Sequence, residues 1–126
     1  MNRVVLDASA ILAVAFKEAG SVVMEQQLHA LVSAVNHAEV VSKLLRFQMP
    51  MNEIAIFLNE TFPKVIAFDK HQADMAGQLH DMHRVNGLSY ADCSCLALAK
   101  LRGIPVLTGD RKWATIRLAV EVKLFR

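Results

Sequence analysis

The stretch Leu88–Ala114, "LSYADCSCLALAKLRGIPVLTGDRKWA", joins a helix pattern, a strand pattern and a charged turn. Ser89 and Asp92 have the spacing of a capping box before an apolar run, and Gly103 is typical of a helix end. The apolar run "IPVLT" then predicts a buried strand, and "GDRKW" predicts a turn. A helix that leads directly into a buried strand is typical of α/β proteins.

The rest of the chain repeats this alternation of strands and helices. Short apolar runs rich in β-branched residues predict strands at Val4–Leu6 and Ala30–Val35, and a further strand at Val65–Phe68. Ser9 and Asn36 are predicted to cap the helices that follow the first two strands. We also expect helices that end near Leu28, that cover residues 51–60 and 69–85, and an edge strand within residues 118–124. This order predicts a single α/β domain over residues 1–126, with a mostly parallel central sheet flanked by helices.

The composition bounds the class of protein. The 126 residues are 54% hydrophobic and 21% charged, with few prolines and glycines, which excludes a disordered or low-complexity chain. Asp7 interrupts the first apolar run, and no uncharged run approaches the roughly 20 residues that span a bilayer. We therefore expect a cytoplasmic protein that is not bound to a membrane. The high apolar content also predicts a homodimer, with residues 36–60 as candidates for contact with a second copy or another partner.

The charge is distributed unevenly along the sequence. The formal net charge is only +2, but residues 100–126 hold seven basic and two acidic side chains and so carry a net charge of +5. Residues 1–99 therefore carry a net charge of −3. A basic segment beside acidic residues suits a polyanion that is held near a cation site. A solvated surface would give the same charge pattern.

Four acidic residues occupy corresponding places in the predicted elements. Asp7 ends the first strand, Glu39 lies in the first turn of the helix after the second strand, Asp92 begins the helix of the opening stretch, and Asp110 follows its strand. In an open parallel sheet, the carboxyl ends of the strands and the amino ends of the following helices meet at one edge. We therefore expect the four carboxylates to converge on one cleft, although each alone is an ordinary turn or helix-start residue.

Carboxylates that converge need a compensating cation. They repel one another and raise one another's pKa, and a hard divalent ion such as Mg²⁺ or Mn²⁺ is their natural partner. One or two such ions suit the hydrolysis of phosphodiester bonds. Arg111 and Lys112, next to Asp110, are candidates to contact flanking phosphates of such a substrate.

Three segments resemble motifs of the PIN domain family: Val4–Ala13 (VVLDASAILA), Val35–Leu44 (VNHAEVVSKL) and Leu88–Ala114. The resemblance covers nearly the whole chain in the family's order, and within the family it is greatest to the VapC-type toxins of bacterial toxin–antitoxin pairs. It implies a three-layer α/β/α fold, a Mg²⁺- or Mn²⁺-dependent ribonuclease activity and inhibition by a cognate antitoxin.

The resemblance also implies roles for individual residues. The family's metal-binding and catalytic acids fall on Asp7, Glu39, Asp92 and Asp110, and supporting hydroxyl groups fall on Ser9 and Thr108. Asp110 would either contact the metal or orient a water molecule bound to it. Two other functional classes remain open: a PIN-like module that binds RNA or protein without cleaving it, and a housekeeping nuclease that processes RNA.

Other residues suggest weaker alternatives. His80 and His83 lie three apart on a predicted helix and are a possible metal pair, although two exposed histidines are the commoner explanation and no third ligand is placed to join them. Cys93 and Cys95 follow a helix start, where the pKa of a thiol can fall, but their spacing favours packing over a redox or zinc site. Trp113 is predicted to anchor the turn after Asp110, with stacking on a base as the alternative.

Overall fold

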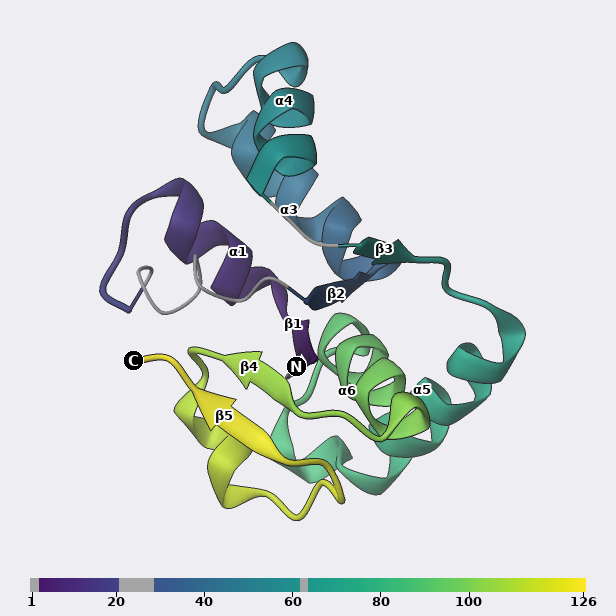
Figure 1. Ribbon diagram of the computed structural model, residues 1–126. Helices are drawn as coiled ribbons and strands as arrows, with labels where there is room; N and C mark the ends of the chain where they lie inside the picture. Colours follow the sequence, from purple (N-terminus) through teal and green to yellow (C-terminus); the bar gives the residue numbers. More distant parts are fainter. Residues whose placement is uncertain (1–2, 21–28, 62–63) are drawn as a thin grey trace.

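The computed structural model describes residues 3–20, 29–61 and 64–126 (Figure 1). In this part of the chain, five strands form one sheet in the order β3-β2-β1-β4-β5, and every neighbouring pair is parallel. The strands are short, each with three or four residues. They are β1 (Val4–Leu6), β2 (Ala30–Ser33), β3 (Lys64–Ile66), β4 (Val106–Thr108) and β5 (Val122–Leu124).

Helices cover both faces of the sheet, which gives the predicted three-layer α/β/α arrangement (Figure 1). On one face lie α1 (Ala8–Ala15), α3 (Ala34–Arg46) and α4 (Met51–Thr61), and on the other lie α5 (Lys70–Met82) and α6 (Tyr90–Arg102). Short 3-10 helices η1 (Arg84–Asn86) and η2 (Arg111–Thr115) complete the connections. None of the described helices is both long enough and apolar enough to cross a membrane.

Alternation along the strands produces two separate apolar cores. Val4 and Leu6 face the core formed with α1, α3 and α4, whereas Val5 between them faces the core formed with α5 and α6. All three side chains are at most 2% exposed. Because the sheet is buried on both faces, its strands appear in the sequence as continuous apolar runs rather than as an apolar–polar alternation.

Several local predictions are confirmed. Ser89 and Asp92 form the capping box of α6, and Gly103 ends that helix in the left-handed conformation at φ 65°. Asp69 caps α5, and the strand within residues 118–124 lies at the edge of the sheet as β5. The helix predicted to end near Leu28 lies outside the described residues.

Two predicted helix caps are wrong. Asp7, not Ser9, caps α1, because its carboxylate accepts a hydrogen bond from the Ala10 N–H while Ser9 is already helical. Ser33, not Asn36, caps α3, so β2 ends two residues earlier than its apolar pattern suggested and Glu39 lies in the second helical turn. At α3, the apolar residues Ala34 and Val35 that continue the strand pattern belong instead to the helix.

Candidate functional site

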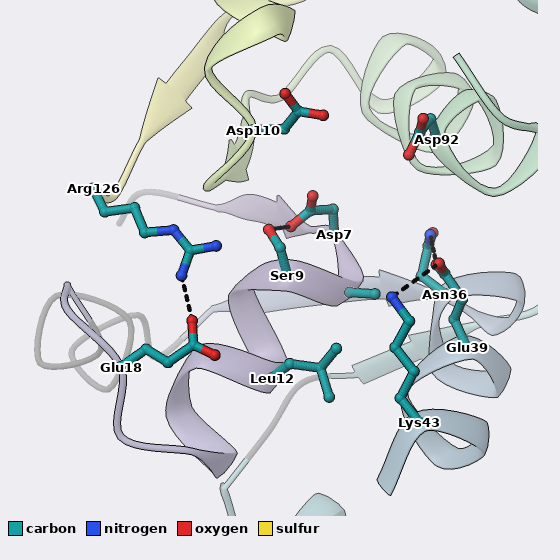
Figure 2. A pocket seen from close by; sticks show the side chains of 11 residues that line it. Asp7, Ser9, Leu12, Glu18, Asn36, Glu39, Lys43, Asp92, Asp110 and Arg126 are labelled. Carbon is teal, nitrogen blue, oxygen red and sulfur yellow. Dashed lines mark hydrogen bonds and ion pairs between the residues drawn. The ribbon is translucent and has the colours of Figure 1, made fainter. Parts of the chain in front are cut away.

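The order of the strands creates a switch point in the sheet. The chain proceeds outward from β1 through β2 to β3, and then returns to the other side of β1 with β4. Such a point leaves a crevice at the carboxyl ends of the two central strands, which is where open α/β sheets bind ligands. Here a cleft of about 320 Å³ is lined by all four predicted acids, from four separate segments of the chain (Figure 2).

Asp7 is the most constrained of the four acids. Its side chain accepts hydrogen bonds from Ser9 Oγ at 2.7 Å and the Ala10 N–H at 3.1 Å on Oδ1, and from Thr108 Oγ1 at 2.7 Å on Oδ2. The residue is only 7% exposed. Burial raises the pKa of Asp7 above 3.8, these hydrogen bonds oppose the rise, and the charge of Asp92 adds to it. Asp7 is thus held in one position at an energetic cost that a cation would relieve.

The turn that carries Asp110 is tied to the same network. Thr108 Oγ1 accepts a hydrogen bond from the Asp110 N–H at 3.0 Å, and Ser9 Oγ accepts one from the Gly109 N–H at 3.1 Å. Both predicted supporting hydroxyl groups therefore connect the end of β1 to the turn after β4. Asp110 caps η2 through Oδ1, which accepts from the Lys112 N–H, so among the described contacts its Oδ2 makes no hydrogen bond.

Asp92 is positioned by its own helix. Its Oδ2 accepts from the Ser89 N–H at 2.9 Å, while Ser89 Oγ accepts from the Asp92 N–H at 3.0 Å. This pair fixes the carboxylate at the amino end of α6, where the helix dipole favours a negative charge. Figure 2 shows Asp110 and Asp92 in the upper part of the view, with Asp7 below Asp110 and Glu39 below Asp92.

Asn36 was missed as a site residue by the sequence prediction, which treated it only as a helix cap. Its Nδ2 donates to Glu39 Oε1 at 3.2 Å and to the carbonyl oxygen of Ala91 at 3.1 Å, so it joins Glu39 to the start of α6. It is 1% exposed, and its Oδ1 has no hydrogen-bond partner. A polar side chain three residues before Glu39 shares a helix face with it, which is the signal that would have identified Asn36.

The cations that line the cleft are not the two residues predicted to contact flanking phosphates. Arg111 and Lys112 are exposed and are not among the described residues that line the cleft, whereas Lys43 and Arg126 line it. Lys43 Nζ lies 4.0 Å from Glu39 Oε2, and Arg126 forms an ion pair with Glu18. Lys43 comes from the same helix as Glu39, whereas the Arg126–Glu18 pair comes from segments that the sequence prediction did not connect with the cleft.

The donor set of the cleft fits a hard divalent ion, although its side chains are spread apart. Carboxylate oxygens are the ligands that Mg²⁺ and Mn²⁺ prefer. Within the described residues, however, no three His, Cys, Asp or Glu side chains lie close enough together to hold a metal as they stand. Mutual repulsion separates carboxylates in the absence of a cation. Asp7 would be the fixed ligand, and the less constrained Asp110 and Glu39 would move toward the ion.

The weaker alternatives from the sequence are not supported. His83 is buried rather than exposed, and His80 stacks on Tyr90 with ring centroids 3.9 Å apart. Burial raises the pKa of the Cys93 thiol to about 11, with a further contribution from Asp92, which is the opposite of activation. Trp113 is 1% exposed, so it anchors the turn and is not available to stack on a base.

Comparison with known proteins is consistent with this geometry. The model of the PIN domain family matches residues 4–118. No curated protein matches the sequence significantly. Solved structures with a similar fold include a DNA-bound VapBC from Salmonella typhimurium, with a TM-score of 0.76, 17% identity and 100% of each chain covered. A toxin–antitoxin complex from Klebsiella pneumoniae has a TM-score of 0.73 and 16% identity over 98% of each chain. VapBC-5 from Mycobacterium tuberculosis has a TM-score of 0.65 and 20% identity, over 100% of this chain and 99% of that one. At these identities the likeness establishes the fold.

Proposed function

The chain belongs to the PIN domain family, and from this premise we propose that it is a divalent-metal-dependent endoribonuclease that acts as the toxin of a toxin–antitoxin pair. The observation that carries the proposal is the convergence of Asp7, Glu39, Asp92 and Asp110 on one cleft at the switch point of the sheet. Nuclease activity is typical of the family, and an acidic cleft is the kind of site that phosphodiester hydrolysis requires.

The four acids would hold Mg²⁺ or Mn²⁺ in this proposal. A divalent ion bound there would promote ionisation of a water molecule and neutralise charge on the phosphate group. The protein would supply a rigid ligand in Asp7, held from both sides by Ser9 and Thr108. Asn36 would position Glu39, and the capping box would position Asp92. Such supporting hydrogen bonds orient ligands and maintain their basicity.

The remaining parts of the proposal concern the partners. Arg111 and Lys112 are exposed beside Asp110 and would contact phosphates of RNA beyond the cleft. The solved structures with a similar fold include toxin–antitoxin complexes, which supports an antitoxin partner for this chain. Large apolar side chains are exposed around the end of α3 and the start of α4, which favours a homodimer or antitoxin contact there. They are Leu45, Phe47, Met51 and Ile56.

Expression in a bacterial host tests the proposed toxin function. We expect the wild-type chain to arrest growth, and Asp7→Asn, which preserves the size of the side chain but removes its charge, to relieve the arrest at equal protein level. Co-expression of the product of an adjacent antitoxin gene should restore growth with the wild-type chain. Arrest that persists in Asp7→Asn would indicate a binding module that acts without cleavage.

A further inference from the structure

The acidic cleft has a cation on either side of its central carboxylate. Among the described residues that line it, five are acidic and only Lys43 and Arg126 are basic. Figure 2 shows these two side chains reaching in from opposite sides, with Asp7 and Ser9 between them. A polyanion that crosses this cleft would therefore meet favourable charge only at these two points among the described lining residues.

Arg126 is placed by packing that extends well beyond its own side chain. The neighbouring Phe125 is 7% exposed, and its N–H donates to the carbonyl oxygen of Thr108 at 3.2 Å. A Cβ atom on Gly109 would lie 2.7 Å from Arg126 Nε and 2.9 Å from Phe125 Cζ, so only glycine permits this close approach. The Arg126 guanidinium group also lies 5.0 Å from the centre of the Phe125 ring. The turn that carries Asp110 therefore also positions the Arg126 side chain.

Both cations are held by exposed ion pairs that can exchange partners. The Arg126 and Glu18 side chains are 37% and 41% exposed, and those of Lys43 and Glu39 are 49% and 34% exposed. Such pairs contribute little to stability because water already screens them. A phosphate group is a stronger partner for the planar guanidinium group, which can bind it through two hydrogen bonds.

We propose that Arg126 and Lys43 bind phosphates of single-stranded RNA on either side of the bond to be cleaved, so that the backbone crosses the acidic site between them. This inference rests on the proposed ribonuclease function and adds the path of the substrate. The two cations offset the repulsion between the cleft and the RNA backbone, and they hold the strand in register over the acids. Both act as positioning residues rather than as catalytic ones.

The test measures kcat and KM for cleavage of a short, unstructured oligoribonucleotide in Mg²⁺ over a range of salt concentrations. We expect Arg126→Ala to raise KM about tenfold with little change in kcat, because the lost contact binds the ground state and the transition state of the substrate equally. The slope of log(kcat/KM) against log[salt] should become shallower by about 0.7 for each lost phosphate contact, and by about 1.4 in the double variant with Lys43→Ala. Arg126→Lys and Lys43→Arg should restore most of the slope.

Arg84→Ala is the matched control, since it also breaks an exposed pair between an arginine and a carboxylate, that of Asp81, but lies outside the cleft. If the salt slope of Arg126→Ala equals that of Arg84→Ala, the proposed path is wrong while the ribonuclease function stands. A gain in activity in Arg126→Ala would contradict the inference in another way, because it would make Arg126 a competitor of the metal. Failure of the wild-type protein to cleave RNA at all would overturn both proposals.

Discussion

Asp7 combines burial with a charge that the fold alone does not neutralise. It caps α1, receives hydrogen bonds from Ser9 and Thr108, and is still destabilised as an anion by its burial. Sites that need a ligand often retain such a cost in the free protein, where the group serves function rather than stability. The consequence is a conflict between stability and activity that can be measured at this one residue.

Without metal, Asp7→Asn should be more stable than the wild-type protein at neutral pH. The folded-state pKa of Asp7 lies above its unfolded value near 3.8, so the stabilising contribution of its protonated form is present below that pH. This contribution is lost as the pH rises through the folded-state pKa. The free energies of unfolding of the two proteins, measured by urea unfolding in the presence of a chelator, should therefore approach each other as the pH falls toward 3.8. A wild-type protein that is more stable than the variant at neutral pH would contradict this account.

Thr108→Val should destabilise the protein and reduce its activity together. The side chain is fully buried and donates to Asp7 Oδ2 while it accepts from the Asp110 N–H. Valine keeps the shape but leaves two buried groups unpaired, at a cost of about 1–3 kcal/mol. Thr115→Val is the control, because Thr115 is exposed and only donates to the Lys112 carbonyl oxygen. Equal urea midpoints for the two variants would show that the hydrogen bonds of Thr108 do not contribute to the free energy of unfolding.

The residues of the site could be predicted only in part from the sequence. Asp7, Asp92 and Asp110 follow strand or helix signals that are local, so their positions could be inferred. Asn36 and Arg126 depend on partners 55 and 108 residues away, and no local pattern marks such contacts. The choice of Arg111 and Lys112 rests on their place next to Asp110, and their contact with phosphates stays a prediction.

At the scale of elements, a glycine can be required either by its backbone conformation or by close contact with a neighbouring side chain. Gly109 lies in the turn that the sequence predicted after β4, but its φ lies outside the left-handed range, and the constraint on this residue comes from Phe125 and Arg126. Helix boundaries were predicted well where a cap and a glycine both mark them, as in α6. They failed at β2, where Ala34 and Val35 continue the apolar run into the helix.

Gly109→Ala should lower both stability and the affinity for RNA, because the added methyl group displaces Phe125 and Arg126. Gly77→Ala is the opposite control: it lies within α5 with no atom within 4 Å of the added Cβ, and should stabilise the protein by about 0.5–1 kcal/mol. Thermal unfolding and the KM for an oligoribonucleotide would measure both effects. A Gly109→Ala variant with wild-type KM would show that the position of Arg126 beside Gly109 does not matter for substrate binding.

At the scale of the whole molecule, the topology explains why distant acids share a cleft. The parallel sheet places the ends of β1 and β4 side by side, and the helices bring Glu39 and Asp92 to the same edge. The order of strands and helices indicated this class of fold. It did not reveal that, within the described residues, no three of these side chains lie close enough to hold a metal ion as they stand, because such distances depend on side-chain positions rather than on the order of elements.

Metal binding should therefore stabilise the folded protein. An ion that binds only the folded state raises the free energy of unfolding in proportion to the logarithm of its concentration above Kd. We expect Mn²⁺ to raise the melting temperature of the wild-type protein but not that of Asp7→Asn. An equal rise in both proteins would place the ion elsewhere.

The most direct test of the central claim is RNA cleavage by the purified protein, with Mn²⁺ present or chelated, compared with Asp92→Asn. The account predicts cleavage by the wild-type protein only when the metal is present, and a loss of at least about a hundredfold in the variant with its fold intact, because one ligand charge is removed. Cleavage by Asp92→Asn at the wild-type rate, or cleavage that persists when the metal is chelated, would contradict it.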